Sequence, residues 1–182
     1  MTDLLLYQKR IARYQRRDLL RLWQAIQKGN TPKWETGKAF EYLVLRAFEL
    51  EGAEVRWPYR VELGGEEVEQ IDGVVYSDEL ACLIECKDSV EKMNIEPIAK
   101  MRNQLLRRPA ATLGMVFSRG GFTEPAQTLT QFIAPQTILL WNGFEVEFAL
   151  RRKYMRPGLM EKYRYCIENG NLYDDLTKGK TP

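Results

Sequence analysis

The sequence contains no histidine among its 182 residues. Catalytic triads built on histidine, histidine zinc sites and nucleases that pair histidine with a metal are therefore excluded. Only three cysteines are present, Cys82, Cys86 and Cys166, and they lack the spacing of metal ligands. The first two would lie roughly 13 Å apart along a strand, too far for a disulfide. Acid and base chemistry must come from carboxylates, lysine, tyrosine or metal-bound water.

Long apolar segments are also missing. No run reaches the roughly 18 apolar residues of a membrane span, and the N-terminus lacks the apolar stretch and cleavage site of a signal peptide. There is no internal repeat, no low-complexity tract and no G-x-x-x-x-G-K-[ST] phosphate loop. With 45% hydrophobic residues, the chain is long enough for one core. These features predict a cytoplasmic protein with one globular domain and no membrane partner.

The charge is unevenly distributed. Residues 1–30 contain seven Lys/Arg and two Asp/Glu, residues 151–182 contain eight and four, and the middle contains twelve and nineteen. An acidic centre between basic ends suits a metal-dependent enzyme acting on a polyanion, because carboxylates that bind metal repel phosphate and other groups must attract it. A solvated surface without a partner explains the same numbers. We expect a basic helical extension over 1–30, a core over 31–150 and a basic helical tail over 151–182.

The stretch from Val68 to Lys87 carries the strongest functional signal. Residues 70–76 are rich in β-branched side chains, a polar turn follows, and residues 80–84 form an apolar run, which predicts a β-hairpin. Because side chains alternate along a strand, Gln70 and Asp72 would share one face of the first strand. Glu85 and Lys87 would share one face at the end of the second strand, about 6.6 Å apart along it.

Two carboxylates and a lysine at the end of a buried strand are costly to desolvate unless they pair or hold a metal ion. Carboxylate oxygens suit Mg²⁺, with Mn²⁺ as a substitute. A lysine can orient a water molecule or stabilise the charge on a phosphorane. The alternative is a hairpin edge with a solvated ion pair.

The rest of the chain alternates between helical and strand patterns. The succession of strand, glycine loop, helix and strand from 112 to 141 predicts a parallel crossover, with Thr123 as the helix N-cap. Glu41 lies at the edge of an apolar helical stripe, where a charge is unexpected. We predict helices over 3–28, 31–51, 95–108 and 158–169 and from 123 onward, and strands over 54–63, 112–118 and 136–141.

Together these motifs resemble a known family. Asp72, followed after a hairpin by Glu85-Cys86-Lys87, resembles the PD-(D/E)xK phosphodiesterase superfamily with its restriction-endonuclease-like fold. GKAFE, ending at Glu41, is similar to the first-helix signature of that fold, in which a glutamate projects toward the strand acids. SRGGFTEPA and ILLWNGFE look like the second half of the Mrr-like subgroup. The resemblance spans about residues 34–148.

This resemblance implies an α/β fold, with a central mixed sheet flanked by helices and helical extensions at both ends. It implies an endonuclease that hydrolyses DNA phosphodiester bonds with Mg²⁺. Asp72 and Glu85 would bind the metal ion, Glu41 would hold a second metal ion or the attacking water, and Lys87 would orient that water and stabilise negative charge. Gln70 is a candidate to support these ligands without touching the metal.

Candidate DNA contacts lie outside this cluster: Arg13, Arg16, Arg17, Arg102, Gln104 and Arg119. Since one such site cuts one strand, a homodimer would suit a duplex substrate. Two alternatives stay open. The chain could be an inactive DNA-binding or assembly module of the same fold, or a nuclease of another class, such as a junction resolvase, an exonuclease or an RNA-cutting effector.

Overall fold

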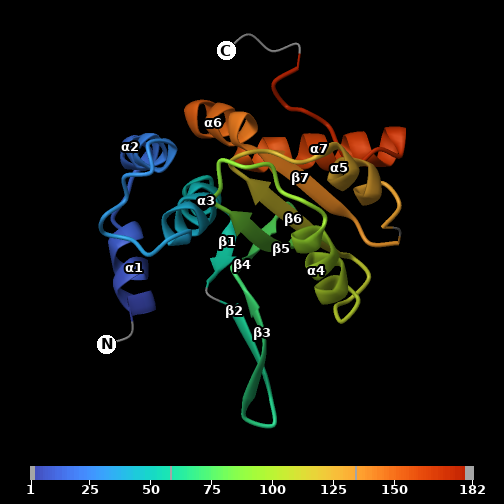
Figure 1. Ribbon diagram of the computed structural model, residues 1–182, viewed down its shortest axis with the longest axis horizontal. Helices are drawn as coiled ribbons and strands as arrows, with labels where there is room; N and C mark the ends of the chain where they lie inside the picture. Colours follow the sequence, from blue (N-terminus) through green and yellow to red (C-terminus); the bar gives the residue numbers. More distant parts are fainter. Residues whose placement is uncertain (1–2, 58, 134, 179–182) are drawn as a thin grey trace.

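The computed structural model describes residues 3–57, 59–133 and 135–178. Its centre is a five-stranded sheet with the order β1-β4-β5-β6-β7, flanked by helices (Figure 1). Strands β1, β4 and β5 pair antiparallel, whereas β5, β6 and β7 pair parallel. The sheet consists of β1 (Glu54–Arg56), β4 (Gly73–Ser77), β5 (Leu80–Lys87), β6 (Thr112–Ser118) and β7 (Ile138–Asn142). The predicted mixed sheet with flanking helices is confirmed.

A second, two-stranded sheet projects away from the body of the protein (Figure 1). It pairs β2 (Tyr59–Leu63) with β3 (Glu66–Ile71). The described helices are α1 (Asp3–Ile11), α2 (Arg16–Gln27), α3 (Lys38–Leu50), α4 (Glu96–Leu105), α5 (Glu124–Thr130), α6 (Gly143–Arg152) and α7 (Met155–Asn169). No helix in the described ranges is both long and apolar enough to cross a membrane.

Strand β5 divides the hydrophobic core into two layers, as expected for an apolar strand that is covered on both faces. Cys82 and Ile84 pack in a cluster formed largely by α2, α3, α6 and α7. Leu83, which points the other way, packs in a second cluster with residues of α4 and α5. The sheet therefore lies between two helical layers, with α3 on one side and α4 on the other.

The predicted hairpin is confirmed from Gly73 onward. Asp78 and Glu79 have φ angles of 51° and 67°, as a two-residue hairpin turn with two left-handed positions requires. The prediction of a single strand through Asp72 is wrong, because β3 ends at Ile71 and pairs with β2, whereas β4 starts at Gly73 and pairs with β5. Asp72 occupies the bend between the two sheets.

The N-terminal predictions need two corrections. The single helix expected over 3–28 is two helices, and the guanidinium of Arg46 on α3 donates to the carbonyls of Ala12 and Tyr14 in the break between them. The helix expected from residue 31 begins only at Lys38. Its preceding residue, Gly37, has a φ of 85°, which is incompatible with a right-handed helix.

Two further corrections concern residues 54–63 and the C-terminal part. The single strand expected over 54–63 is two strands, β1 and β2, which belong to different sheets. Helix α6 was not predicted, although Asn142 caps it by accepting from the backbone N–H groups of Phe144 and Glu145. Helix α7 begins at Met155, earlier than the predicted 158.

Candidate active site

Three structural elements bring the predicted acidic residues together. Glu41 lies in the first turn of α3, Asp72 in the bend before β4, and Glu85 near the end of β5. The β4–β5 register pairs Gly73 with Ile84, so the next residues outward along the two strands are Asp72 and Glu85. The fold therefore places carboxylates from a helix, a bend and a strand at one end of the central hairpin.

Asp72 is held in place by the backbone of β5. The N–H of Cys86 donates a hydrogen bond of 2.7 Å to Oδ2 of Asp72. Burial, together with the negative charges of Glu41 and Glu85, raises the pKa of Asp72 to about 7 from its ordinary 3.8, although the Cys86 N–H and Lys38 oppose this rise. The carboxylates are thus close enough to repel one another, and a positive charge placed among them would be stabilised.

Glu41 pairs with a lysine from its own helix. The Nζ of Lys38 lies 2.6 Å from Oε2 of Glu41, and the two side chains are only 17% and 13% exposed. Burial raises the pKa of Glu41, with a further contribution from Glu85, while Lys38 and Lys100 act in the opposite direction. Burial alone would lower the pKa of Lys38, but the hydrogen bond to Glu41 and the charges of Glu41 and Asp72 raise it above its usual value.

Glu85 pairs with a lysine from the other helical layer. Lys100 on α4 donates to Oε2 of Glu85 over 2.8 Å, with side chains 51% and 16% exposed. Lys38 and Lys100 were not predicted as members of the site. A local signal existed for Lys38, which lies three residues before Glu41 in a helix. Lys100 lies 15 residues from Glu85 and meets it only through the fold.

Lys87 ends β5 with an exposed side chain. Its ammonium makes no hydrogen bond or ion pair with the described part of the chain. Since Lys87 follows Glu85 by two positions on the same strand, both side chains leave the sheet on the same side. The structure therefore leaves this lysine available at the edge of the carboxylate cluster.

Gln70 lies on β3, outside the central sheet, and its side chain is exposed. Its backbone carbonyl accepts a long hydrogen bond of 3.5 Å from Nε2 of Gln104. The prediction that Gln70 and Asp72 share one face of a strand is wrong, because the bend at Asp72 interrupts the alternation of side chains. Gln104 is buried at 2% exposure, and its Oε1 has no hydrogen-bond partner among the described residues.

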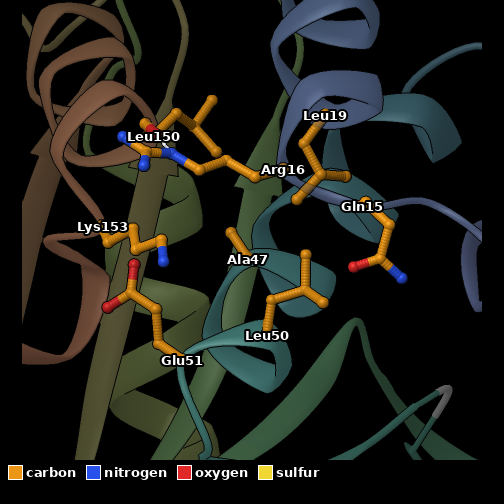
Figure 2. A pocket seen from close by; sticks show the side chains of 8 residues that line it. All are labelled: Gln15, Arg16, Leu19, Ala47, Leu50, Glu51, Leu150 and Lys153. Atoms are coloured by element: carbon orange, nitrogen blue, oxygen red, sulfur yellow. Dashed lines mark hydrogen bonds between the residues drawn. The ribbon is translucent and has the colours of Figure 1, made fainter.

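The predicted arginine contacts differ in their surroundings. Arg13, Arg17 and Arg102 are exposed. Arg119 forms a largely buried ion pair with Asp88. The Nε of Arg16 donates to the Leu150 carbonyl over 3.1 Å, at the rim of a hollow between α2, α3 and the end of α6 (Figure 2). None of the three clustered acids lines that hollow, so the hollow is separate from the candidate chemistry.

The donor chemistry of the cluster fits a divalent cation. Asp72, Glu41 and Glu85 each use one oxygen in the contacts above, and their other oxygens take no part in those contacts. Hard carboxylate oxygens are the ligands that Mg²⁺ and Mn²⁺ prefer. Within residues 3–57, 59–133 and 135–178, no three Cys, Asp or Glu side chains already stand in a compact metal-binding group. Binding would therefore require these side chains to adjust.

The mixed sheet, the helix that carries an acid and the hairpin that ends in two acids and a lysine define a restriction-endonuclease-like domain. The family described as Restriction endonuclease (Mrr_cat) matches residues 33–147. The chain therefore belongs to this family, the Mrr-like subgroup of the PD-(D/E)xK superfamily.

Three solved structures are similar to this chain to different degrees. A crystal structure described as that of a protein of unknown function, AF1548, has a TM-score of 0.50 and 20% identity over 72% of this chain and 77% of its own. The MspJI restriction endonuclease in complex with a 27-mer oligonucleotide has a TM-score of 0.45 and 16% identity, covering 85% of this chain and 35% of its own. The DNA modification-dependent restriction endonuclease AspBHI has a TM-score of 0.41 and 9% identity, covering 84% and 39%. No curated protein sequence matches the chain.

Proposed function

We propose that the chain is a metal-dependent endonuclease that hydrolyses DNA phosphodiester bonds, using Mg²⁺ with Mn²⁺ as a possible substitute. The observation that carries this proposal is the convergence of Glu41, Asp72 and Glu85. Burial, together with the negative charges of Glu41 and Glu85, raises the pKa of Asp72 to about 7. Mutual repulsion between carboxylates destabilises a fold unless a cation offsets it. Membership of a restriction endonuclease family, which generally uses divalent metals, supports the same function.

Each residue has a distinct role in this proposal. Asp72 and Glu85 hold the metal ion, and Glu41 holds a second ion or positions the attacking water. A bound divalent ion would polarise the phosphate and lower the pKa of its water. Lys87 orients the water and offsets the negative charge that develops on the phosphoryl oxygens, which its exposed position at the cluster edge allows.

DNA is proposed as the substrate because of the family and because cations lie outside the acidic cluster. Arg13, Arg17 and Arg102 are exposed and could contact phosphates. Basic contacts of this kind attract any polyanion, so they account for affinity without distinguishing DNA from RNA. Arg16, Gln104 and Arg119 remain candidates only if they leave their present partners or buried positions.

The experiment is a plasmid-nicking assay in Mg²⁺, Mn²⁺ and EDTA, with Glu85→Gln as the site variant and Glu66→Gln as the control. Glu66 is an exposed acid on the projecting β3 strand, so its variant removes the same charge outside the cluster. We expect nicking with metal by the wild type and the control, and none in EDTA or by Glu85→Gln. A folded wild type that cleaves none of circular, linear, branched and single-stranded DNA or RNA would refute the proposal and favour an inactive module.

A further inference from the structure

Two lysines from opposite helical layers hold the carboxylates of the candidate site. Lys38 on α3 binds Oε2 of Glu41 at 2.6 Å, and Lys100 on α4 binds Oε2 of Glu85 at 2.8 Å. Each lysine also acts beyond its direct partner, because Lys38 interacts electrostatically with Asp72 and Lys100 with Glu41. The two ammonium groups thus serve the whole cluster rather than two separate ion pairs.

The charges of the cluster nearly balance, with one negative charge left over when all three acids are ionised. Above the pKa of Asp72, which is about 7, the three ionised carboxylates contribute three negative charges, and the two paired ammonium groups contribute two positive charges. One divalent cation supplies the same charge as these two lysines together. The lysines therefore offset in the metal-free protein the repulsion that a metal ion would offset in the loaded protein.

The lysines and a divalent cation cannot keep the same positions. A metal ion bonds to a carboxylate oxygen at about 2.1 Å, and the ammonium groups already lie close to oxygens of the same carboxylates. Two cations held within about 4–5 Å in a partly buried site repel one another strongly. A lysine can move away because its charge lies at the end of a flexible four-carbon stem.

We propose that Lys38 and Lys100 are internal counter-ions. In the absence of metal they form ion pairs with Glu41 and Glu85, respectively, and they move away from these carboxylates when a divalent cation binds. This inference rests on the proposed function, since it assigns the same carboxylates to the metal. It makes the lysines positioning residues that stabilise the metal-free fold and weaken metal binding. Lys100 is 51% exposed and can swing into solvent, whereas Lys38 is 17% exposed and is more confined.

The test measures metal affinity without DNA, by calorimetric titration of Mn²⁺ and Ca²⁺ into the wild type, Lys38→Met and Lys100→Met. Methionine removes the charge but keeps an unbranched stem. We expect each variant to bind metal about fivefold more tightly, the effect of one partly screened ion pair, with the larger gain at Lys38. The control is Lys9→Met, which removes an exposed lysine of α1 and should bind metal like the wild type.

Thermal unfolding adds a readout that does not depend on activity. In EDTA, Lys38→Met and Lys100→Met should unfold at lower temperatures than the wild type, and saturating metal should remove most of that difference. Lys100→Arg retains the positive charge and should resemble the wild type in both measurements. A lysine that merely packed against its neighbours would lower the unfolding temperature with and without metal.

The outcomes separate this inference from the proposed function. If the wild type binds metal but Lys100→Met binds it equally or more weakly, the counter-ion assignment is wrong while the metal site stands. If the wild type binds no divalent ion, the proposed function fails and the counter-ion role fails with it. Lys100→Met tests the counter-ion role even if Lys38→Met does not fold, because Lys100 is half-exposed and its replacement disturbs the fold less.

Discussion

Replacing Asp72 by asparagine should make the metal-free protein more stable at neutral pH while destroying its metal site. Asparagine has nearly the same shape, and its Oδ1 can still accept the hydrogen bond that Cys86 N–H now donates to Asp72. The change removes one of three clustered negative charges. The expected gain in stability follows because the deleted carboxylate is disfavoured by burial and by Glu41 and Glu85.

The pKa of Asp72 fixes both the sign and the size of this effect. Its folded-state value of about 7 lies above the ordinary 3.8, so between about pH 4 and pH 7 the folded protein keeps a proton that the unfolded chain has released. The contribution of Asp72 to wild-type stability therefore falls as pH rises through this window and is level above it. At about 1.36 kcal/mol per pKa unit, the ceiling is about 4 kcal/mol. Glu41 would ionise more easily in the variant, so we expect a gain of about 2–4 kcal/mol.

The assay is urea unfolding in EDTA at intervals from pH 4 to pH 8, for the wild type, Asp72→Asn and the exposed control Glu66→Gln. The difference in free energy of unfolding between Asp72→Asn and the wild type should be small at pH 4 and should grow up to about pH 7. The control should follow the wild type. Calorimetry with Mn²⁺ should show no tight binding by Asp72→Asn.

Two results would contradict this expectation. A stability difference that does not change with pH would mean that Asp72 is not buried against the other acids. Cleavage of plasmid DNA by Asp72→Asn at the wild-type rate across a Mg²⁺ series would mean that the active site lies elsewhere. A pH-dependent gain in stability with intact cleavage would separate the two conclusions, confirming the electrostatics but not the catalytic role.

Further substitutions test the lysine of the motif, the basic surface and the core. Lys87→Ala should keep metal affinity by calorimetry, because the carboxylates remain, but its nicking rate should fall on the order of 10²-fold or more. Replacing the exposed Arg13 and Arg17 together by Ala should flatten the salt dependence of DNA binding, by roughly one unit of log–log slope for each phosphate that is no longer neutralised; an unchanged slope would show that both are only solvated. Lys162→Met should lower the free energy of unfolding in urea by about 3–5 kcal/mol. Lys162 and Glu145 form a fully buried ion pair, and the substitution leaves the buried Glu145 carboxylate without its lysine. Adding Glu145→Gln should recover part of that stability.

Local patterns were sufficient for much of the central sheet and its crossover. Strand β6 has the predicted bounds of Thr112–Ser118, and Thr123 caps α5 by accepting from the N–H of Ala126. These features depend on neighbouring residues, such as an apolar run with polar ends or a threonine before a proline. The break between α1 and α2 could not be predicted in this way. No glycine or proline marks it, and its carbonyls are bound by Arg46 from another helix.

The difference between features set by neighbouring residues and features set by tertiary contacts also explains which members of the candidate site could be predicted from the sequence. Glu85 and Lys87 lie on β5, and Asp72 directly precedes β4, the hairpin partner of β5, so strand spacing alone placed them near one another. The predicted position of Gln70 on the same strand face as Asp72 is wrong. Side chains alternate with a period of two only along a continuous strand, and the bend at Asp72 takes the chain from one sheet to the other. The partner of Glu85 could not be deduced from spacing, since Lys100 reaches it only after α4 has packed against β5 and β6. The acids are thus encoded locally, whereas the cation that balances Glu85 depends on the assembled fold. Substitutions at Lys100 therefore test the tertiary arrangement of the site more directly than substitutions within the motif.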